Sequence, residues 1–331
     1  MQSTSDSPAV SIENLRVGFG DRAHRVYPVD GVTLEIGTSE TLALVGESGS
    51  GKTLTGQSLA RLLPKDVEVS ADKLRVVGQE VLRANPADLR AIRSRCVSLI
   101  FQDPMTALNP VFTVRSQLAA VLKQARPTLR GRRLGEEIVK ALREVGISDP
   151  EDRLRAYPHQ LSGGLRQRVM IALALASSPR VVIADEPTTA LDASIHHQIL
   201  GLLKWLQREQ QMAMLLITHD FSAVADVADR VAVMYSGKIV ETGRTADVLK
   251  HPAHPYTQML IASIPGNSTQ RGALLPAIPG RVPRPDKRPT GCHFSDRCPL
   301  VAEPCYTSAP SLSGTDDHQV ACFNAGKGSA A

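Results

Sequence analysis

The sequence lacks a hydrophobic run long enough to cross a membrane. Its longest apolar runs, such as Val169–Ala176, fall far short of the roughly 20 residues that a membrane-spanning helix needs. The first ten residues are polar and lack the charged-then-apolar layout of a signal peptide. We therefore expect a cytoplasmic protein, in which any membrane role comes through partner proteins.

The sequence also lacks a dense basic block with interleaved aromatic residues. Its 38 basic and 33 acidic residues give a formal charge of only +5, which disfavours a nucleic-acid partner. Apolar residues make up 42% of the 331 positions and charged residues 21%, so we expect a globular core without wholesale disorder. The length suits one large domain with a smaller appendage, and no internal repeat is visible.

Cysteine is scarce until the last forty or so residues. Cys96 stands alone, and we expect it to act as a buried small hydrophobe. The gaps within the later group are five, six and sixteen residues, without the CxxC pairs that zinc ribbons prefer. Four thiolates with irregular gaps and a Cys-Pro step favour a 4Fe-4S iron–sulfur cluster, with structural Zn²⁺ and metal-free thiols as the alternatives. The predicted cluster ligands are Cys292, Cys298, Cys305 and Cys322.

Short apolar strands alternate with helical patterns along most of the chain. Such alternation predicts an α/β fold with a parallel sheet at its core. After about His251 the composition changes, and prolines become frequent between Pro265 and Pro310. We predict that this tail is a separate module without a hydrophobic core of its own. The expected strands are 11–17, 32–36, 41–45, 181–184, 214–218 and 231–235, and the expected helices are 53–63, 134–145 and 195–210.

A glycine-rich loop follows the expected strand 41–45 and opens a helix. Its eight residues, 46–53, fit the pattern GxxxxGK(S/T). Glycines let backbone N–H groups turn inward around phosphates, a lysine reaches the β- and γ-phosphates, and the final hydroxyl ligates Mg²⁺. We predict that ATP binds through Gly46, Ser48, Gly49, Ser50, Gly51, Lys52 and Thr53.

A second element is the apolar strand 181–184, which ends in two carboxylates. Asp185 is placed to ligate Mg²⁺ at the mouth of the sheet, and Glu186 to polarise the attacking water. A strand ending in Asp-Glu is weak evidence alone, because it could be a solvated strand end. Paired with the glycine-rich loop, it predicts a nucleotide-hydrolysing site.

Between these two elements lies Leu161–Arg168, which resembles the signature sequence of ABC ATPases. The fifth position departs from the usual Gln and is Leu165; peptide-importer subunits often carry an apolar residue there. The resemblance implies that two cassettes sandwich two ATP molecules. It further implies that Ser162, Gly163 and Gly164, at a helix start, face the γ-phosphate held by the opposite chain.

Other ABC elements follow in the family's order. Gln102 matches the Q-loop glutamine, which contacts Mg²⁺ and the attacking water. Thr189–Asp192 matches the D-loop at the dimer seam, so Asp192 joins the predicted nucleotide site. His219 matches the switch histidine that bonds the γ-phosphate. Phe19 stands where the family places an aromatic ring against adenine, with Tyr27 as a competing choice.

Two further segments resemble oligopeptide and dipeptide importer ATPases: Phe101–Pro110, and His254–Gln258 followed by Ile264 and Pro265. The resemblance implies an ATPase at the cytoplasmic face of the inner membrane. Its implied partners are two permease subunits, a second ATPase subunit in a heterodimer or homodimer, and a substrate-binding protein. Cysteine tails of this kind are associated with an iron–sulfur cluster in the same family.

The resemblance implies a P-loop ABC ATPase cassette at 11–250, comprising a parallel-sheet core, an antiparallel β subdomain and a helical subdomain at about 104–178. A flexible leader at 1–10 and a C-terminal extension at 251–331 flank the cassette. Rival interpretations are an importer motor for nickel, glutathione or sugar-derived ligands, a soluble ABC ATPase, and a non-catalytic interaction protein. The intact Lys52, Asp185, Glu186 and His219 argue against the last.

Overall fold

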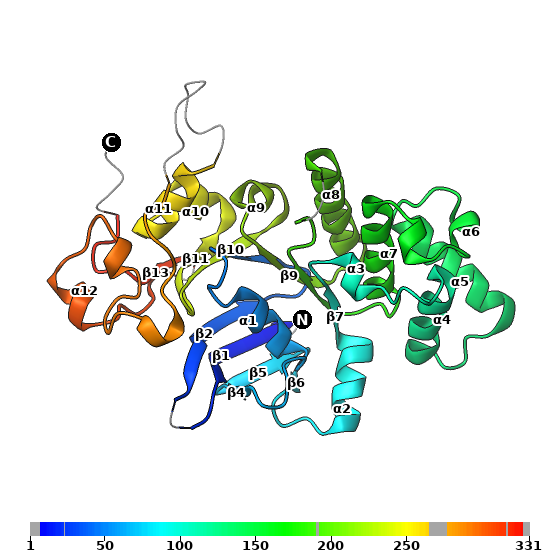
Figure 1. Cartoon of the computed structure of the whole chain (residues 1–331), viewed down its shortest axis with the longest axis horizontal. Helices are drawn as coiled ribbons and strands as arrows, with labels where there is room; N and C mark the ends of the chain where they lie inside the picture. Colours follow the sequence, from blue (N-terminus) through cyan, green and yellow to red (C-terminus); the bar gives the residue numbers. More distant parts are fainter. Residues whose placement is uncertain (1–6, 23, 190–191, 265–276, 316, 327–331) are drawn as a thin grey trace, which may run out of the picture. The chain divides into compact units, whose positions relative to one another are not determined.

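The computed structural model describes residues 7–22, 24–189, 192–264, 277–315 and 317–326 (Figure 1). The chain divides into two compact units. The first unit takes its described residues from Met1–Val10, Ile36–Ser39 and Arg75–Leu215. The second takes them from Ser11–Glu35, Glu40–Leu74 and Leu216–Ala331.

The first unit contains a pair of parallel strands, β7 (Val97–Ile100) and β8 (Val181–Asp185). Every residue of β8 is buried, as expected for a strand inside a parallel sheet. The short β6 (Gln79–Glu80) pairs antiparallel with the end of β5 (Lys73–Val76). The first unit thus supplies a strand end at which the residues after β7 and β8 emerge side by side.

Helices make up most of the first unit, and Figure 1 shows α4 to α7 gathered in one group. In α4, Val114, Leu118 and Leu122 are buried at four-residue spacing, which places one apolar stripe against its neighbours. The helices are α2 (Pro86–Ala91), a π-helical turn (Ile92–Cys96), α3 (Pro104–Ala107), α4 (Val114–Ala125), α5 (Gly131–Glu144), α6 (Pro150–Arg153), a 3-10 turn (Pro158–Gln160), α7 (Gly163–Leu175) and α8 (Ala193–Gln210).

The second unit contains the parallel pair β3 and β10, to which β11 adds antiparallel, followed by β13 and β12. The long β1 also pairs antiparallel with β4 in this unit. The strands are β1 (Val10–Phe19), β2 (Val26–Ile36), β3 (Thr41–Val45), β4 (Glu68–Ser70), β9 (Ala213–Thr218), which the chain enters from the first unit, β10 (Arg230–Tyr235), β11 (Lys238–Arg244), β12 (Ser313–Thr315) and β13 (His318–Val320).

Five α-helices and two short 3-10 turns lie in the described part of the second unit. They are α1 (Lys52–Leu59), α9 (Phe221–Val227), α10 (Thr245–Lys250), α11 (Pro255–Ala262), α12 (Glu303–Thr307), and the turns Pro285–Lys287 and Ser295–Arg297. None of the helices in the described ranges combines the length and apolar character required to span a bilayer.

The predicted α/β fold is confirmed, and the strand expected at 41–45 has those bounds. The helix expected at 53–63 is shorter, because Arg61 adopts a left-handed φ of 49° that ends α1 before Pro64. The last two residues of the predicted leader, Ala9 and Val10, are buried and so belong to the folded part of the chain.

The tail contributes an aromatic residue to the hydrophobic core of the second unit, a contact that the sequence did not predict. Phe294 is 1% exposed and belongs to one buried cluster with Val45 of β3 and Tyr256 of α11. Cys292 and Cys298 pack against the same cluster. A single aromatic residue in a proline-rich segment shows no periodicity, so the sequence pattern did not reveal this anchor.

Candidate functional site

The glycine-rich loop lies in the second unit between buried β3 and helix α1. Gly46 adopts a φ of 155°, and a Cβ at this position would stand 2.1 Å from the carbonyl oxygen of Met234. Gly51 adopts a φ of 109°, with Met234 and Pro28 within 3.0 Å of where its Cβ would be. Side chains at these two positions would force the loop away from β10, so the glycines are required for its path.

Lys52 is only 5% exposed and folds back over the loop. Its Nζ donates hydrogen bonds to the carbonyl oxygens of Gly46 (2.7 Å) and Glu47 (3.0 Å). Ser50 is fully buried, and its carbonyl oxygen accepts a hydrogen bond from the N–H of Gly237. The loop therefore holds a cation at its centre and is braced by the turn that follows β10, while Thr53 lies exposed in the first turn of α1.

Glu47 is a loop residue that sequence analysis did not single out. Its carboxylate receives two hydrogen bonds from Arg297, and its backbone N–H donates to the hydroxyl of Tyr256. Arg297 lies 250 positions further along the chain. No local pattern in the sequence could signal a pairing at this distance.

In the first unit, strand register brings Gln102 and Glu186 together. Ile100 of β7 pairs with Ala184 of β8, and each predicted residue comes two positions later. The Nε2 of Gln102 donates to Oε2 of Glu186 at 3.0 Å, and Oγ1 of Thr189 donates to the same oxygen at 2.7 Å. The carboxylate is therefore held by two neutral donors at the end of a buried strand.

The backbone around Glu186 is unusual. Glu186 itself has a φ of 45°, in the left-handed region that is costly for a residue with a side chain. Asp185, one position earlier, is 6% exposed. The adjacent Pro187 accepts a 2.6 Å hydrogen bond from Nε2 of buried Gln167, a residue of α7 that sequence analysis did not place in the site.

The predicted signature residues lie at the start of α7. Ser162 is the N-cap, and its hydroxyl accepts a long hydrogen bond of 3.4 Å from the N–H of Leu165. Ser162 and Gly163 are exposed, and Gly164 is half-buried. Asp192 occupies the N-cap position of α8, while Ala190 and Leu191 of the predicted D-loop lie outside the described residues.

The remaining predicted residues belong to the second unit. His219 follows β9 and is exposed, and the next residue, Asp220, caps α9 through its side chain. Phe19 ends β1 and is half-buried. Tyr27, also half-buried, packs its ring so close to Gly18 that a Cβ there would stand 2.9 Å from it.

The four cysteines of the tail are free, and Cys298 responds electrostatically to the other three. Burial raises the pKa of Cys298 to about 11, with further contributions from the other three thiols. Burial likewise raises the pKa of Cys292 and Cys322, each of which also responds to Cys305. No three His, Cys, Asp or Glu side chains in the described ranges are placed to hold one metal ion. The thiols therefore gather in one region without forming a ready metal site.

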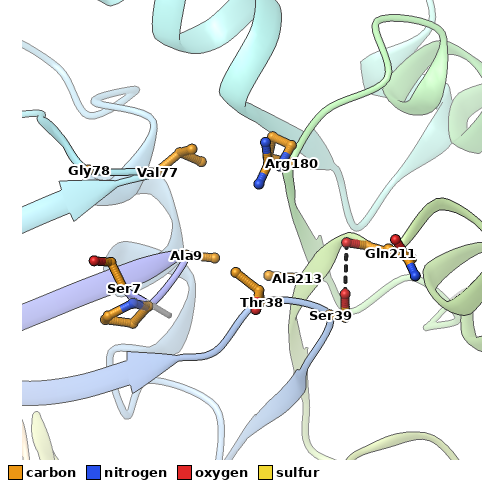
Figure 2. A pocket seen from close by; sticks show the side chains of 10 residues that line it. Ser7, Ala9, Thr38, Ser39, Val77, Gly78, Arg180, Gln211 and Ala213 are labelled. Carbon is orange, nitrogen blue, oxygen red and sulfur yellow. Dashed lines mark hydrogen bonds between the residues drawn. The ribbon is translucent and has the colours of Figure 1, made fainter. Parts of the chain in front are cut away.

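None of the predicted site residues lines the cavity in Figure 2, which lies within the first unit. This cavity of about 220 Å³ is bordered by Arg180, Thr38 and Val77, among others. On one side Oγ of Ser39 donates to the carbonyl oxygen of Gln211 at 3.0 Å.

The fold agrees with those of solved ABC cassettes. The chain resembles the ATP-binding cassette MJ0796, in a dimeric post-hydrolysis state bound to ADP and Pi, with a TM-score of 0.62 and 26% identity. That match covers 71% of this chain and 98% of the cassette. A second match is cbiO1 from Clostridium perfringens, part of the ABC transporter complex cbiONQ, with a TM-score of 0.61, 25% identity, and 73% and 91% of the two chains covered.

Two families match the sequence: ABC transporter over residues 29–189, and the C-terminal region of oligopeptide/dipeptide transporters over residues 240–305. The dipeptide transport ATP-binding protein DppD of Bacillus subtilis is 44% identical over 95% of this chain and 94% of its own length. A putative peptide import ATP-binding protein of Brucella ovis is 42% identical over 95% of this chain and 96% of its own. The chain belongs to the ABC transporter family of ATPases, in the branch that carries the oligopeptide/dipeptide transporter C-terminal region.

Proposed function

We propose that this chain binds and hydrolyses ATP to drive the import of di- or oligopeptides through partner permease subunits. One observation carries the proposal. The similarity to peptide-import relatives runs through both the cassette and the C-terminal region, and so covers more than the features that all ABC ATPases share. The alternatives are an importer for nickel, glutathione or sugar-derived ligands, and a soluble ABC ATPase.

The residues of the glycine-rich loop bind the phosphates of ATP in this proposal. Lys52, already held at the centre of the loop, exchanges its carbonyl partners for phosphate oxygens. Thr53, Gln102 and Asp185 offer oxygen ligands, which are the donors that Mg²⁺ prefers. When bound, Mg²⁺ offsets the charge of the phosphates.

Glu186 is the proposed orienting group for the attacking water. Its Oε2 already accepts two hydrogen bonds, which fix the direction of the carboxylate. Gln102 shares this role, and His219 is proposed to contact the γ-phosphate. Adenine is proposed to stack on Phe19 or Tyr27.

A second ATPase subunit completes each site in this proposal. Ser162, Gly163 and Gly164 offer the start of α7, where the helix dipole favours an anion, to the nucleotide held by the opposite subunit. Asp192 lies at the same proposed seam. The pair is a heterodimer or a homodimer, working with two permeases and a substrate-binding protein.

An apolar groove in the first unit is the proposed docking site for a permease helix. It has a volume of about 260 Å³ and is lined by Phe101, Leu108 and Met170, among others. Phe101 immediately precedes Gln102, so an occupant of the groove lies beside a residue proposed to act in hydrolysis. Nearby in sequence, Val111 and Phe112 are 70% and 52% exposed, as expected for apolar residues that a partner covers. The subunit is thereby held at the cytoplasmic face of the inner membrane.

We also propose that Cys292, Cys298, Cys305 and Cys322 ligate a 4Fe-4S cluster, with Zn²⁺ as the alternative. The proposal rests on the preference of iron–sulfur clusters for cysteine ligands and on the closeness of the other three thiols to Cys298, which responds to each of them electrostatically. Iron, acid-labile sulfide and zinc are measured in protein purified without oxygen. About four irons and four sulfides per chain support the cluster. One zinc without iron supports the alternative, and a metal-free protein excludes both.

The domain division is proposed as predicted: a leader at 1–10, a cassette at 11–250 with a helical subdomain at about 104–178, and a C-terminal extension at 251–331. Pro265, part of one motif that suggested the peptide branch, lies outside the described residues.

Uptake of a labelled dipeptide by vesicles that contain the assembled transporter tests the function. We expect uptake to require ATP and to be lost with Glu186→Gln, while nickel and glutathione are not accumulated. ATP-dependent uptake of one of those ligands instead of peptides would replace the proposed substrate. ATP hydrolysis without any membrane partner in a pull-down would favour a soluble ABC ATPase.

Docking is tested by Phe112→Asp, which puts a charge on an exposed apolar residue four positions after Leu108 of the groove. We expect the variant to lose co-purification with the permeases but to keep nucleotide binding. Trp205→Asp is the matched control, because Trp205 is similarly exposed at 49% but lies on α8 of the same unit. Equal loss of co-purification in both variants would argue against the groove.

A further inference from the structure

Glu47 has a partner for each of its functional groups. Its backbone N–H donates to the Tyr256 hydroxyl at 2.9 Å, and its carbonyl oxygen accepts from Lys52 Nζ at 3.0 Å. Its carboxylate accepts from both terminal nitrogens of Arg297, at 2.7 and 3.0 Å. This position of the glycine-rich loop 46–53, called the phosphate loop from here on, is thus held by contacts from α11, from the tail and from within the loop. All of these contacts lie inside the second unit.

Arg297 is committed to this contact. Its side chain is 5% exposed, and its Nε donates to the carbonyl oxygen of Pro279 at 2.7 Å. Nη1 also reaches the Tyr235 hydroxyl at 3.3 Å, and the guanidinium lies 5.7 Å from the centre of that ring. Burial alone would lower the pKa of Arg297, but the hydrogen bonds to Glu47 and Tyr235 outweigh it and raise the pKa. The guanidinium therefore stays charged, and it depends on Glu47 for compensation.

Three aromatic residues pack against one another next to this ion pair. The Tyr235 ring meets Tyr256 and Phe294 edge-on, with centroids 4.7 and 5.1 Å apart. Phe294 and Arg297 lie in the same short segment, and the Arg297 N–H donates to the carbonyl oxygen of Phe294. A shift of the tail at Phe294 would therefore move the guanidinium that holds Glu47.

We propose that the C-terminal extension contributes to ATP binding through Arg297. Arg297 is a positioning residue that keeps the phosphate loop in its binding conformation through Glu47. The inference rests on the proposed function, since it assumes that the loop binds ATP. The bidentate fork fixes the direction of the Glu47 carboxylate, which a lysine could not do with one ammonium. Because the loop is set before ATP arrives, less binding free energy is spent on ordering it.

The test measures the dissociation constant of MgATP for the full-length chain, and KM and kcat of the assembled transporter. Arg297→Met keeps an unbranched apolar stem similar to that of arginine but removes the charge and the guanidinium fork. We expect it to weaken MgATP binding about tenfold or more, because it leaves the Glu47 carboxylate without its partner. We expect KM to rise and kcat at saturating ATP to stay within about twofold of wild type, the pattern of a lost binding interaction.

Glu47→Gln removes the carboxylate of the same ion pair and leaves the sequence of the tail unchanged. It decides the question if Arg297→Met fails to fold. Its effect is expected to be smaller, because glutamine still accepts one hydrogen bond. The double variant should bind MgATP about as well as Arg297→Met alone, since each change removes the same interaction. Asp317→Asn is the control: it removes the exposed Arg244–Asp317 ion pair of the same unit.

A second measurement separates positioning from general stability. Coupling is reciprocal, so MgATP should slow amide exchange at Ser295–Cys298 in the wild type and lose this effect in Glu47→Gln. Folded Arg297→Met and Glu47→Gln proteins that bind MgATP as the wild type does would overturn the inference. Failure of the wild type to bind MgATP would instead overturn the proposed function.

Discussion

In the second unit the inner residues of the phosphate loop are buried and held by protein groups, whereas two residues of the first unit that are proposed to act on the nucleotide lie at the surface. Ser50 is fully buried and Lys52 is 5% exposed, and Glu47 is held by three partners. By contrast, Gln102 and the signature residue Ser162 are exposed. The contrast indicates that the loop is shaped by its own chain, while the other residues are left accessible for groups that arrive later.

The largest expected effect comes from Glu186→Gln, which alters the first unit without touching the loop. Glutamine can still accept hydrogen bonds from Gln102 and Thr189, so the local geometry should survive. The loss of the carboxylate should slow ATP turnover by about 100- to 1,000-fold, the range typical of losing one preorganised group of this kind. Turnover is measured with the assembled transporter, and MgATP binding with the full-length chain. Normal turnover in the variant would contradict the role of Glu186.

Acidic pH is expected to destabilise the second unit at the start of α11, the helix whose Tyr256 contacts the phosphate loop. His254 caps α11, where its Nδ1 accepts a hydrogen bond from the Tyr256 N–H, and burial lowers its pKa from 6.5 to about 3. The neutral ring therefore contributes stability that is fully present above pH 6.5 and is lost as the pH falls towards 3. At pH 5 this loss is about 2 kcal/mol of unfolding free energy.

His254→Asn retains an acceptor for the Tyr256 N–H but cannot be protonated in this range. We expect its unfolding free energy, measured by urea denaturation, to fall less steeply between pH 7 and pH 5 than that of the wild type. Equal slopes would show that another group dominates the acid sensitivity of the second unit.

A smaller effect is expected from Gln167→Leu, which removes the hydrogen bond to Pro187 beside Glu186. The variant should lose about 1 kcal/mol or more of stability, because the carbonyl of Pro187 loses its donor. It should also lose turnover, since that carbonyl helps to place Glu186. Gln207→Leu is the matched control: Gln207 is another buried glutamine of this unit, and it donates to the carbonyl oxygens of Ser39 and Met212. Similar stability but different turnover in the two variants is the predicted outcome.

Much of the α/β fold could be predicted because its strands are short apolar runs bounded by glycine or charged residues. The phosphate loop was recognisable because its chemistry depends on backbone shape, which only glycines allow at Gly46 and Gly51. The pairing of Gln102 with Glu186 follows from strand register and appears only once β7 and β8 are aligned.

The role of the tail could not be predicted in the same way. Arg297 lies between an aspartate and a cysteine, in a segment where the cysteines drew attention as metal ligands. Its contact with Glu47 depends on how the tail packs against Tyr235 and Tyr256. Such contacts join residues far apart in sequence and leave no periodic pattern.

The most direct test compares Glu186→Gln and Arg297→Met in the same preparation, measuring the MgATP dissociation constant and the turnover rate of each. If loop shape and hydrolysis reside in different parts of the chain, Glu186→Gln keeps wild-type affinity and loses turnover. Arg297→Met then loses affinity but regains near-normal turnover at saturating ATP. If both variants lose affinity, or both lose turnover at saturating ATP, the division between a preformed binding loop and a separate group of residues that carries out hydrolysis is contradicted.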